Sequence, residues 1–534
     1  MIHGLFNHSR FEQNTHRWPN GSNLSIWQLI GCAIPLALSN AVFAQEAVGG
    51  EAATSSTSKK MTLVPRVTVT ETLTDNVSLS ANGRQSDMIT EISPGLRVTQ
   101  SVGRVRGLLD YSLNGRAYTS GTSATNIQQT LSSQATAELI EGRAFVEVGA
   151  GIGQQAISAS GAQSSATGVQ NSNLSETSNF RVAPYLKGSL GGGVDYDVRY
   201  SLTNSRSNGV ASAESSATGL SFAIGGKPSG GKLGWSANAS SNTNSFAGGR
   251  TTESDVVSGG LTYSIVPQLV ANASLGRENT NVSSVGKIAN WTNSLGISWN
   301  PTPSTTASLS RTNRPFGDTH SIGFSHRTAK TAWQYSDNQD VTNTPSQSGF
   351  GSLGNVYDLF YAQFASIEPD PIKRAALVEG YLQTNGINPK ANVLGGFLTS
   401  AVAIQRRQNL SLALLGVRST VTFLVSRSVS SRLDKVSTAI DDLSNGSLVE
   451  QNGFSINLGH RLTPESALNW IVSSQRSTSS GLAQDNASFQ TSLGFSTRLG
   501  QRATASFNAR RAVFESSTIP YQENAISGTL SVQF

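Results

Sequence analysis

The sequence predicts an all-β protein: a transmembrane antiparallel β-barrel of about 22 strands, within a range of roughly 18 to 22. Three observations predict this fold. Segments of roughly 10–16 residues alternate apolar and polar side chains from about Thr62 onward, short turns alternate with longer polar loops, and the chain ends on Phe534. A soluble sandwich is the alternative, but so many alternating segments rarely occur in one sandwich.

The last stretch carries the clearest form of the pattern. In residues 523–534 the apolar side chains of Ile526, Leu530, Val532 and Phe534 fall at every second position or a multiple of it, with Ser, Thr and Gln between them. An apolar face, a polar face and an aromatic terminus are typical of the closing strand of a bacterial outer-membrane barrel. We therefore interpret Phe534 as part of a C-terminal assembly signal for the β-barrel assembly machinery.

Composition fits a barrel whose strands face lipid on one side and water on the other. Only 13% of the residues are charged and 37% are hydrophobic, while 20 Phe, 11 Tyr and 7 Trp are more aromatic side chains than a disordered chain carries. No run of about 20 apolar residues follows the amino terminus, so the sequence predicts no membrane-spanning helix. The net charge is +6 with the basic residues scattered, which predicts no nucleic-acid partner.

The amino terminus predicts an address for export. Residues 1–44 combine a polar, Arg-containing start with a mostly apolar stretch at 24–38 and a small-residue cleavage site ending at Ala44. We expect a signal peptide over 1–44, a flexible segment over 45–61 and the barrel over 62–534.

An alternative lies within the leader. Leu29 to Cys32 resembles a lipoprotein box, in which Cys32 would be lipidated in place of cleavage after Ala44. Cleavage after Ala44 leaves a mature chain without cysteine, which suits passage through an oxidising periplasm.

Successive strands are predicted from their alternation. Leu109, Tyr111 and Leu113 share one face, and a tight turn at Glu141–Gly142 follows the next segment. Later segments repeat the pattern, each leading to a turn rich in Gly, Pro or polar residues; their apolar positions are Ala144, Val146, Val148, Val194, Tyr196, Val198, Leu220, Phe222, Ile224, Leu261, Tyr263, Ile265, Ile322, Phe324, Phe454, Ile456, Leu458, Phe489, Leu493 and Phe495.

Tryptophan residues outside the leader predict a membrane girdle. Each falls on the apolar face of its strand, and most lie within a few residues of a predicted periplasmic turn, where amphipathic rings meet lipid headgroups. The predicted girdle residues are Trp235, Trp291, Trp299, Trp333 and Trp470.

One region departs from the alternation. Residues 341–398 form a long extracellular connection in which 356–368 carries aromatic side chains at helical spacing. Asp370-Pro371 predicts the start of a second short helix, and Asn385-Gly386 its end. Two interpretations stay open for this insert: a surface cap, or a gate folded into the lumen.

The predicted lumen is rich in hydroxyl and amide side chains, with a minority of charges of both signs. Such a lining suits passage of neutral polar solutes such as sugars, although any wet interior needs polar groups. We find no catalytic or metal-ligating constellation, and therefore predict no enzyme and no cofactor. The candidate lumen-lining charges are Arg104, Arg106, Asp110, Arg116, Glu147, Asp195, Asp197, Arg199, Arg498 and Arg510.

Several stretches resemble the PEP-CTERM-system-associated outer-membrane proteins, a family of β-barrels found beside exosortase and exopolysaccharide biosynthesis genes. The matching stretches are residues 67–80, 86–98, 109–118, 320–345 and 370–389. The resemblance implies the outer membrane and a link to exopolysaccharide export or assembly. It transfers no ligand residue to this chain.

From these observations we expect an integral outer-membrane barrel that helps exopolysaccharide cross, or mature at, the outer membrane. Its expected partners are outer-membrane lipid, the assembly machinery, periplasmic polysaccharide-export proteins and the polysaccharide. Two other hypotheses are a general diffusion porin for small solutes and a non-conducting structural or anchoring barrel.

Overall fold

The computed structural model describes residues 61–534 except 101, 124, 163–168, 170, 211–213, 227–230, 343–360, 362–373, 375–377, 379–395, 401, 437–439 and 481–484. The chain divides into two units, Met1–Ser58 and Lys59–Phe534, and the description below concerns the second. The predicted signal peptide, its cleavage after Ala44, and the 45–61 segment apart from Met61 lie outside the described residues.

The second unit is built from strands of 10 to 16 residues. A short 3-10 helix, η2 (Ser444–Gly446), lies in one connection. The strands are β1 (Met61–Thr74), β2 (Asp87–Gln100), β3 (Val105–Tyr118), β4 (Asn126–Ile140), β5 (Ala144–Ala156), β6 (Leu174–Ser189), β7 (Val194–Ser207), β8 (Ser215–Gly226), β9 (Leu233–Phe246), β10 (Thr251–Val266), β11 (Leu269–Thr280), β12 (Ile288–Thr302), β13 (Thr305–Arg314), β14 (Gly317–Arg327), β15 (Thr331–Thr342), β16 (Ala403–Leu415), β17 (Ser419–Arg432), β18 (Leu448–Arg461), β19 (Ser466–Ser479), β20 (Asn486–Arg498), β21 (Ala503–Ser516) and β22 (Tyr521–Gln533).

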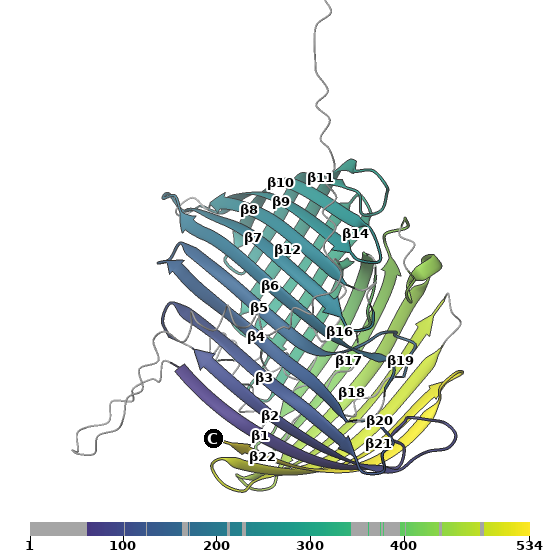
Figure 1. Ribbon diagram of the computed structural model, residues 1–534. Helices are drawn as coiled ribbons and strands as arrows, with labels where there is room; N and C mark the ends of the chain where they lie inside the picture. The colour runs from purple at the N-terminus through teal and green to yellow at the C-terminus, as the bar shows by residue number, and fades with distance from the viewer. Residues whose placement is uncertain are drawn as a thin grey trace, which may run out of the picture. The chain divides into compact units, whose positions relative to one another are not determined.

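The strands form one closed antiparallel ring. Each strand pairs with the next along the chain, and β22 pairs with β1 through Arg66–Thr74 against Ala525–Gln533. Figure 1 shows the strands running obliquely round this barrel. Over Arg66–Thr74 the closure pairs the two strands that would otherwise be sheet edges, and a closed ring is the condition for strands to span a membrane. The prediction of a barrel of about 22 strands is confirmed, since the ring has 22.

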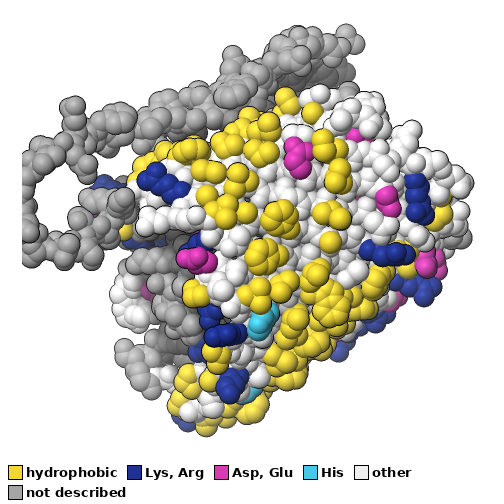
Figure 2. Space-filling model, turned by 90° about the horizontal axis from the view of Figure 1, so that it is seen from below, with side chains coloured by type: hydrophobic (Ala, Val, Ile, Leu, Met, Phe, Trp, Pro, Cys, Tyr) yellow, Lys and Arg dark blue, Asp and Glu magenta, His cyan; other side chains and the backbone are white. Residues whose placement is uncertain are grey.

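The two faces of the ring differ as the alternation predicts. On β1, Val69 and Leu73 are 37% and 57% exposed, while Thr72 and Thr74 between and beyond them are buried. The exposed apolar side chains define the outer face, and the opposite, mostly polar face is the inner face. Figure 2 shows apolar side chains spread over the visible surface, with charged ones scattered among them.

The two ends of the barrel differ in their connections. At one end the turns are short: only Pro267 and Gln268 separate β10 from β11, and Gly142 in the β4–β5 turn has a φ of 66°, which suits glycine. The first residue of β1 and the last of β22 lie at this short-turn end. Longer connections, such as β5–β6 and β17–β18, lie at the opposite end.

The predicted insert at 341–398 lies almost wholly outside the described residues. It separates β15 from β16, at the long-connection end. The part of the chain that the structure describes contains no helix with the length and hydrophobicity that a membrane-spanning helix requires.

Candidate functional site

The long connections pack together into small apolar clusters. One cluster joins Phe246 at the end of β9, Val282 after β11, and Val402 and Leu433 beside β16 and β17. Burial of apolar side chains from separate connections stabilises them as one body. We call the described parts of the β5–β6, β9–β10, β11–β12, β15–β16 and β17–β18 connections the loop cover.

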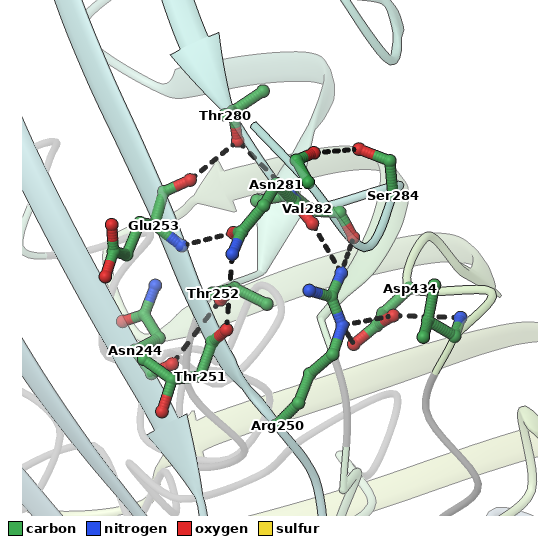
Figure 3. Close-up of polar contacts among 12 residues, drawn as sticks. Asn244, Arg250, Thr251, Thr252, Glu253, Thr280, Asn281, Val282, Ser284 and Asp434 are labelled. Atoms are coloured by element: carbon green, nitrogen blue, oxygen red, sulfur yellow. Dashed lines mark hydrogen bonds and ion pairs between the residues drawn. The ribbon is translucent and has the colours of Figure 1, made fainter. Parts of the chain in front are cut away.

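Arg250 ties one side of the loop cover to the other (Figure 3). Its Nε donates to both carboxylate oxygens of Asp434, at 3.0 and 2.9 Å, and Asp434 is only 2% exposed. Its Nη2 donates to the carbonyl of Val282 at 3.1 Å and to that of Asn281. A buried carboxylate needs such charge-assisted partners, because its hydration is lost.

Asn281 holds those carbonyls in place. Its Oδ1 accepts from the backbone N–H of Glu253 at 2.6 Å, and its own backbone N–H donates to the carbonyl of Glu253 at 3.1 Å (Figure 3). The β11–β12 connection is thereby fixed against β10. The carbonyls of Asn281 and Val282 are therefore already held in position to accept from Arg250. Less conformational entropy is then lost when Arg250 pairs with Asp434.

Asp442 makes a second tie, to the β5–β6 connection. Its Oδ2 accepts from the Ser158 hydroxyl at 2.9 Å and from the Ala159 backbone N–H at 2.6 Å. The Ala159 carbonyl in turn accepts from Asn486 Nδ2 at 3.1 Å. Burial raises the pKa of the Asp442 carboxyl above its ordinary value, and the neighbouring charge of Asp441 acts in the same direction, against the hydrogen bonds.

Asp441 anchors the last part of the loop cover. Its Oδ2 accepts from the backbone N–H and the hydroxyl of Ser400, both at 2.8 Å, and its Oδ1 accepts from Arg432 Nη2 at 2.8 Å. Phe397 forms a bridge with Ala156 at the end of β5. The segment before β16 therefore contacts strands and connections far from it in sequence.

These ties cross the mouth of the barrel. In the ring of 22 strands, β17 is the eleventh strand after β6 and the seventh after β10. Connections from opposite sides of a closed ring can meet only over or within its opening. The Asp442 and Arg250 contacts therefore place the loop cover across the long-connection end of the lumen.

Several predicted lumen charges lie on the inner face in ion pairs near the loop cover or midway along the strands. Asp110 accepts from Arg66 Nη2 at 2.6 Å and from Arg97 Nε at 3.0 Å, and Arg116 Nε donates to Glu91 at 2.5 Å. These pairs join β1, β2 and β3 through side chains as well as through the backbone. With three arginines and two carboxylates, this part of the wall keeps a small net positive charge.

Two further ion pairs on the inner face also join different strands. Glu147 on β5 accepts from Arg199 Nη1 at 2.5 Å, although β6 lies between their strands. Arg199 also lies over the Tyr185 ring, 4.1 Å from its centroid. Arg510 Nη2 donates at 2.9 Å to Glu523, which is fully buried.

The remaining predicted lumen charges lie toward the short-turn end. Arg104 is in the β2–β3 turn and Arg106 at the start of β3; Asp195 and Asp197 are at the start of β7, and Arg498 ends β20. Within the described ranges none of them has an ion pair. The short-turn half of the inner wall therefore holds both paired charges, such as Glu147 with Arg199, and unpaired charges of both signs.

The predicted girdle tryptophans are all on the outer face, where between 42% and 74% of each residue is exposed. Trp235, Trp299, Trp333 and Trp470 lie within five residues of a short turn, whereas Trp291 lies near the long-connection end of β12. At the C-terminus, Phe534 is 65% exposed, and its backbone N–H donates to the Pro65 carbonyl at 2.9 Å.

Sequence reasoning missed a polar patch on the outer face. Asp337 shares the face of Trp333, and it accepts from Arg406 Nη2 at 2.6 Å, from Gln408 at 2.9 Å and from His320. Asp337 falls at a position where the alternation of Trp333 and Tyr335 predicts an apolar residue. In the sequence it therefore looks like a single break in the alternation and not like part of a polar patch. The patch lies toward the long-connection end, above the apolar band.

The ties of the loop cover were also missed. Arg250 and Asp434 lie in different polar loops 184 residues apart, where no periodicity links them. The adjacent pair Asp441-Asp442 was a usable signal, because two carboxylates in a low-charge chain need local partners. No group of three or more His, Cys, Asp or Glu side chains placed to hold a metal occurs among the residues described.

Comparison with solved structures finds siderophore receptors and an iron transporter. The siderophore receptor PirA from Pseudomonas aeruginosa aligns with a TM-score of 0.41 and 10% identity over 88% of this chain and 80% of its own. The FrpB iron transporter from Neisseria meningitidis (F5-1 variant) aligns with a TM-score of 0.47 and 9% identity, covering 88% and 82%. The ferric enterobactin receptor PfeA, in complex with BCV-L6, gives 0.44 and 9%, covering 88% and 81%.

No family model matches the sequence, and no curated protein matches it. The assignment as a closed antiparallel barrel therefore rests on the strand pairing of this chain itself.

Proposed function

We propose that this chain is an outer-membrane β-barrel that provides a gated path for exopolysaccharide. The observation that carries the proposal is the loop cover, whose connections come from opposite sides of the ring and are tied by Arg250–Asp434 and by Asp442. A path that must be closed at rest needs such ties, and one that opens must release them at modest cost.

The location is supported by the outer face. Apolar side chains cover it between tryptophans near the short turns and a polar patch around Asp337 near the long connections. That order matches the apolar band and the interfacial layers of a bilayer. The short-turn end would then face the periplasm, with Phe534 presented there to the assembly machinery.

The cargo class is supported by the inner face and by the family resemblance of the sequence. Hydroxyl and amide side chains dominate the wall, and Asp110, Glu147 and Glu523 are neutralised by arginines. A long neutral polymer passes such a wall by exchanging one hydrogen bond for another. Periplasmic polysaccharide-export proteins are the expected partners at the short-turn end.

The general diffusion porin remains the second candidate, since a wet polar lumen serves both roles. The two differ at the loop cover, which a constantly open pore does not need. The anchoring barrel differs from both, because it predicts no conductance after the ties are cut.

The first experiment locates the polymer in a strain that lacks the gene. Surface and periplasmic polysaccharide are measured in the deletion strain, with and without the restored gene. We expect loss at the surface with periplasmic accumulation, and recovery on restoration. Unchanged surface polymer would reject the export role. Single-channel recordings then separate the porin, which conducts steadily, from a barrel that conducts only after the ties are cut.

A further inference from the structure

A cavity of about 510 Å³ lies against the inner wall formed by β9 to β15. Its volume falls in the range of roughly 300–1,000 Å³ that small-molecule sites in proteins occupy. The wall is made of side chains from successive strands, among them Asn242 and Asn244 on β9, Ser274 on β11 and Ser294 on β12.

The cavity presents hydrogen-bonding groups that the described residues do not satisfy. The side-chain amides of Asn242 and Asn244 make no hydrogen bond among those residues, and Asn244 is 6% exposed. Figure 3 shows the Asn244 amide without a contact, while its backbone carbonyl accepts from Thr252. Each free amide offers both donors and an acceptor. A ligand in the cavity can use these donors and acceptors in place of water.

Hydroxyl groups extend this set along the wall. Ser258, Ser274 and Thr292 line the cavity and have no side-chain hydrogen bond within the described part of the chain. A hydroxyl both donates and accepts, as do the groups of a sugar ring. The wall therefore complements a ligand rich in hydroxyls better than one with a single strong charge.

The cavity lining carries the carboxylates of Glu253, Glu278 and Asp340 and the guanidinium of Arg314. Glu278 is fully buried, and it accepts from Arg314 Nε at 2.9 Å and Nη2 at 2.6 Å and from the Ser254 hydroxyl at 2.8 Å. The guanidinium of Arg314 also lies 4.5 Å from the centroid of the Phe316 ring. The lining as a set is net negative, which disfavours an anionic ligand and is compatible with a neutral one.

The loop cover forms part of the cavity lining. Val282 lines the cavity, and its carbonyl is one of the groups to which Arg250 donates. Phe316 and Val341, which also line it, pack against the apolar cluster of the cover. Release of the cover would therefore expose this part of the wall.

We infer that this cavity is a binding subsite for a short neutral stretch of saccharide, held by the Asn242 and Asn244 amides and the neighbouring hydroxyls. The inference deepens the proposed function and rests on it, because it assigns the cargo a place on the wall. A neutral sugar fills the free amides and hydroxyls and leaves the Glu278–Arg314 pair intact.

The test measures binding to the purified full-length mature barrel in detergent by titration calorimetry. The probes are neutral oligosaccharides of about four to six hexose units and, for comparison, oligogalacturonate of the same length. The variants are Asn242→Ala and Asn244→Ala, singly and together. Asn238→Ala is the matched control, because Asn238 lies on the same face of β9, is exposed and does not line the cavity. Every protein is also measured with Arg250→Ala, so that a closed cover cannot hide the site.

We expect neutral probes to bind, and the double variant to weaken binding about tenfold or more, since two hydrogen bonds of modest strength are lost. Asn238→Ala should bind as the unaltered barrel does. Equal binding by all variants, tighter binding of oligogalacturonate, or no binding by any protein overturns the inference. The change in gel mobility between unheated and heated samples in SDS shows whether each variant is folded. Surface polymer in cells carrying the double variant is measured separately. Export that persists after binding is lost would leave the export role standing without this subsite, and binding that persists after export is lost would separate the subsite from the export role.

Discussion

Arg250→Ala should convert the loop cover from a closed to a frequently open state. The substitution removes the ion pair with Asp434, which is 2% exposed, and it removes the donors to the Asn281 and Val282 carbonyls. Breaking one partner of a buried ion pair costs about 3–5 kcal/mol. The Arg250 side chain is 20% exposed, so we take the lower end, about 3 kcal/mol.

That change of about 3 kcal/mol corresponds to roughly a hundredfold increase in the ratio of open to closed cover. Single-channel recordings in planar bilayers should show it as a matching rise in the open fraction. The matched control is Arg206→Ala, because Arg206 is the next-to-last residue of β7 at the same end, is exposed and has no ion pair within the described residues.

The double variant Arg250→Ala/Asp434→Ala completes the cycle. Removing both charges leaves no unpaired buried carboxylate, so the double variant should open less often than Arg250→Ala alone. Open fractions of Arg250→Ala that match the control would refute the reasoning, as would purely additive effects in the double variant. Either result would mean that the apolar cluster, not the ion pair, holds the cover.

Three further predictions concern pH, packing and assembly. Because the pKa of Asp442 is raised in the closed cover, the closed cover binds the Asp442 proton more readily than the open cover does. Closure should therefore weaken as the pH rises from 3.8, the ordinary pKa, to the raised pKa. Single-channel recordings across that pH window should show the change, and Asp442→Asn should remove most of the pH dependence. Phe514→Ala removes a ring that is 1% exposed and stacked on Tyr521 at 5.3 Å, so it should lower the free energy of unfolding by about 3–5 kcal/mol, measured by denaturant titration of the detergent-solubilised barrel; Phe507→Ala, at a 60% exposed position, is its control. Phe534→Ser should sharply reduce the folded barrel recovered in membranes while leaving the unfolding midpoint of the purified protein nearly unchanged, since Phe534 is 65% exposed; equal recovery would remove its assembly role.

The barrel was predictable because its signal is local. The alternation of Leu109, Tyr111 and Leu113 predicts a strand without reference to any other segment. The same reasoning, repeated along the chain, predicts the strands of the barrel. The charge pairs were only half predictable. Glu147 and Arg199 were recognised as lumen candidates, but their contact depends on the register of β5, β6 and β7, which alternation alone does not fix.

The loop cover and the cavity lay beyond the reach of the sequence for a different reason. In the sequence, nothing distinguishes Asn242 and Ser274 from other polar residues. They line one cavity only because the curved sheet brings their strands into the same wall. Arg250 and Asp434 meet only because the ring closes, since loops on a flat sheet of this width would stay far apart. Distant contacts of this kind follow from topology, and topology follows from all the strands together.

The pairing of β22 with β1 also governs how the molecule is made. All other ladders join neighbours along the chain, but this seam joins Thr68 to Ser531 and Thr70 to Thr529. It extends over Arg66–Thr74 on β1, whereas β1 pairs with β2 from Met61 onward. The seam cannot exist until the final residues have been synthesised, and until then both borders of the growing sheet can capture other chains. Assembly therefore needs the two borders to be shielded from other chains until β1 and β22 meet.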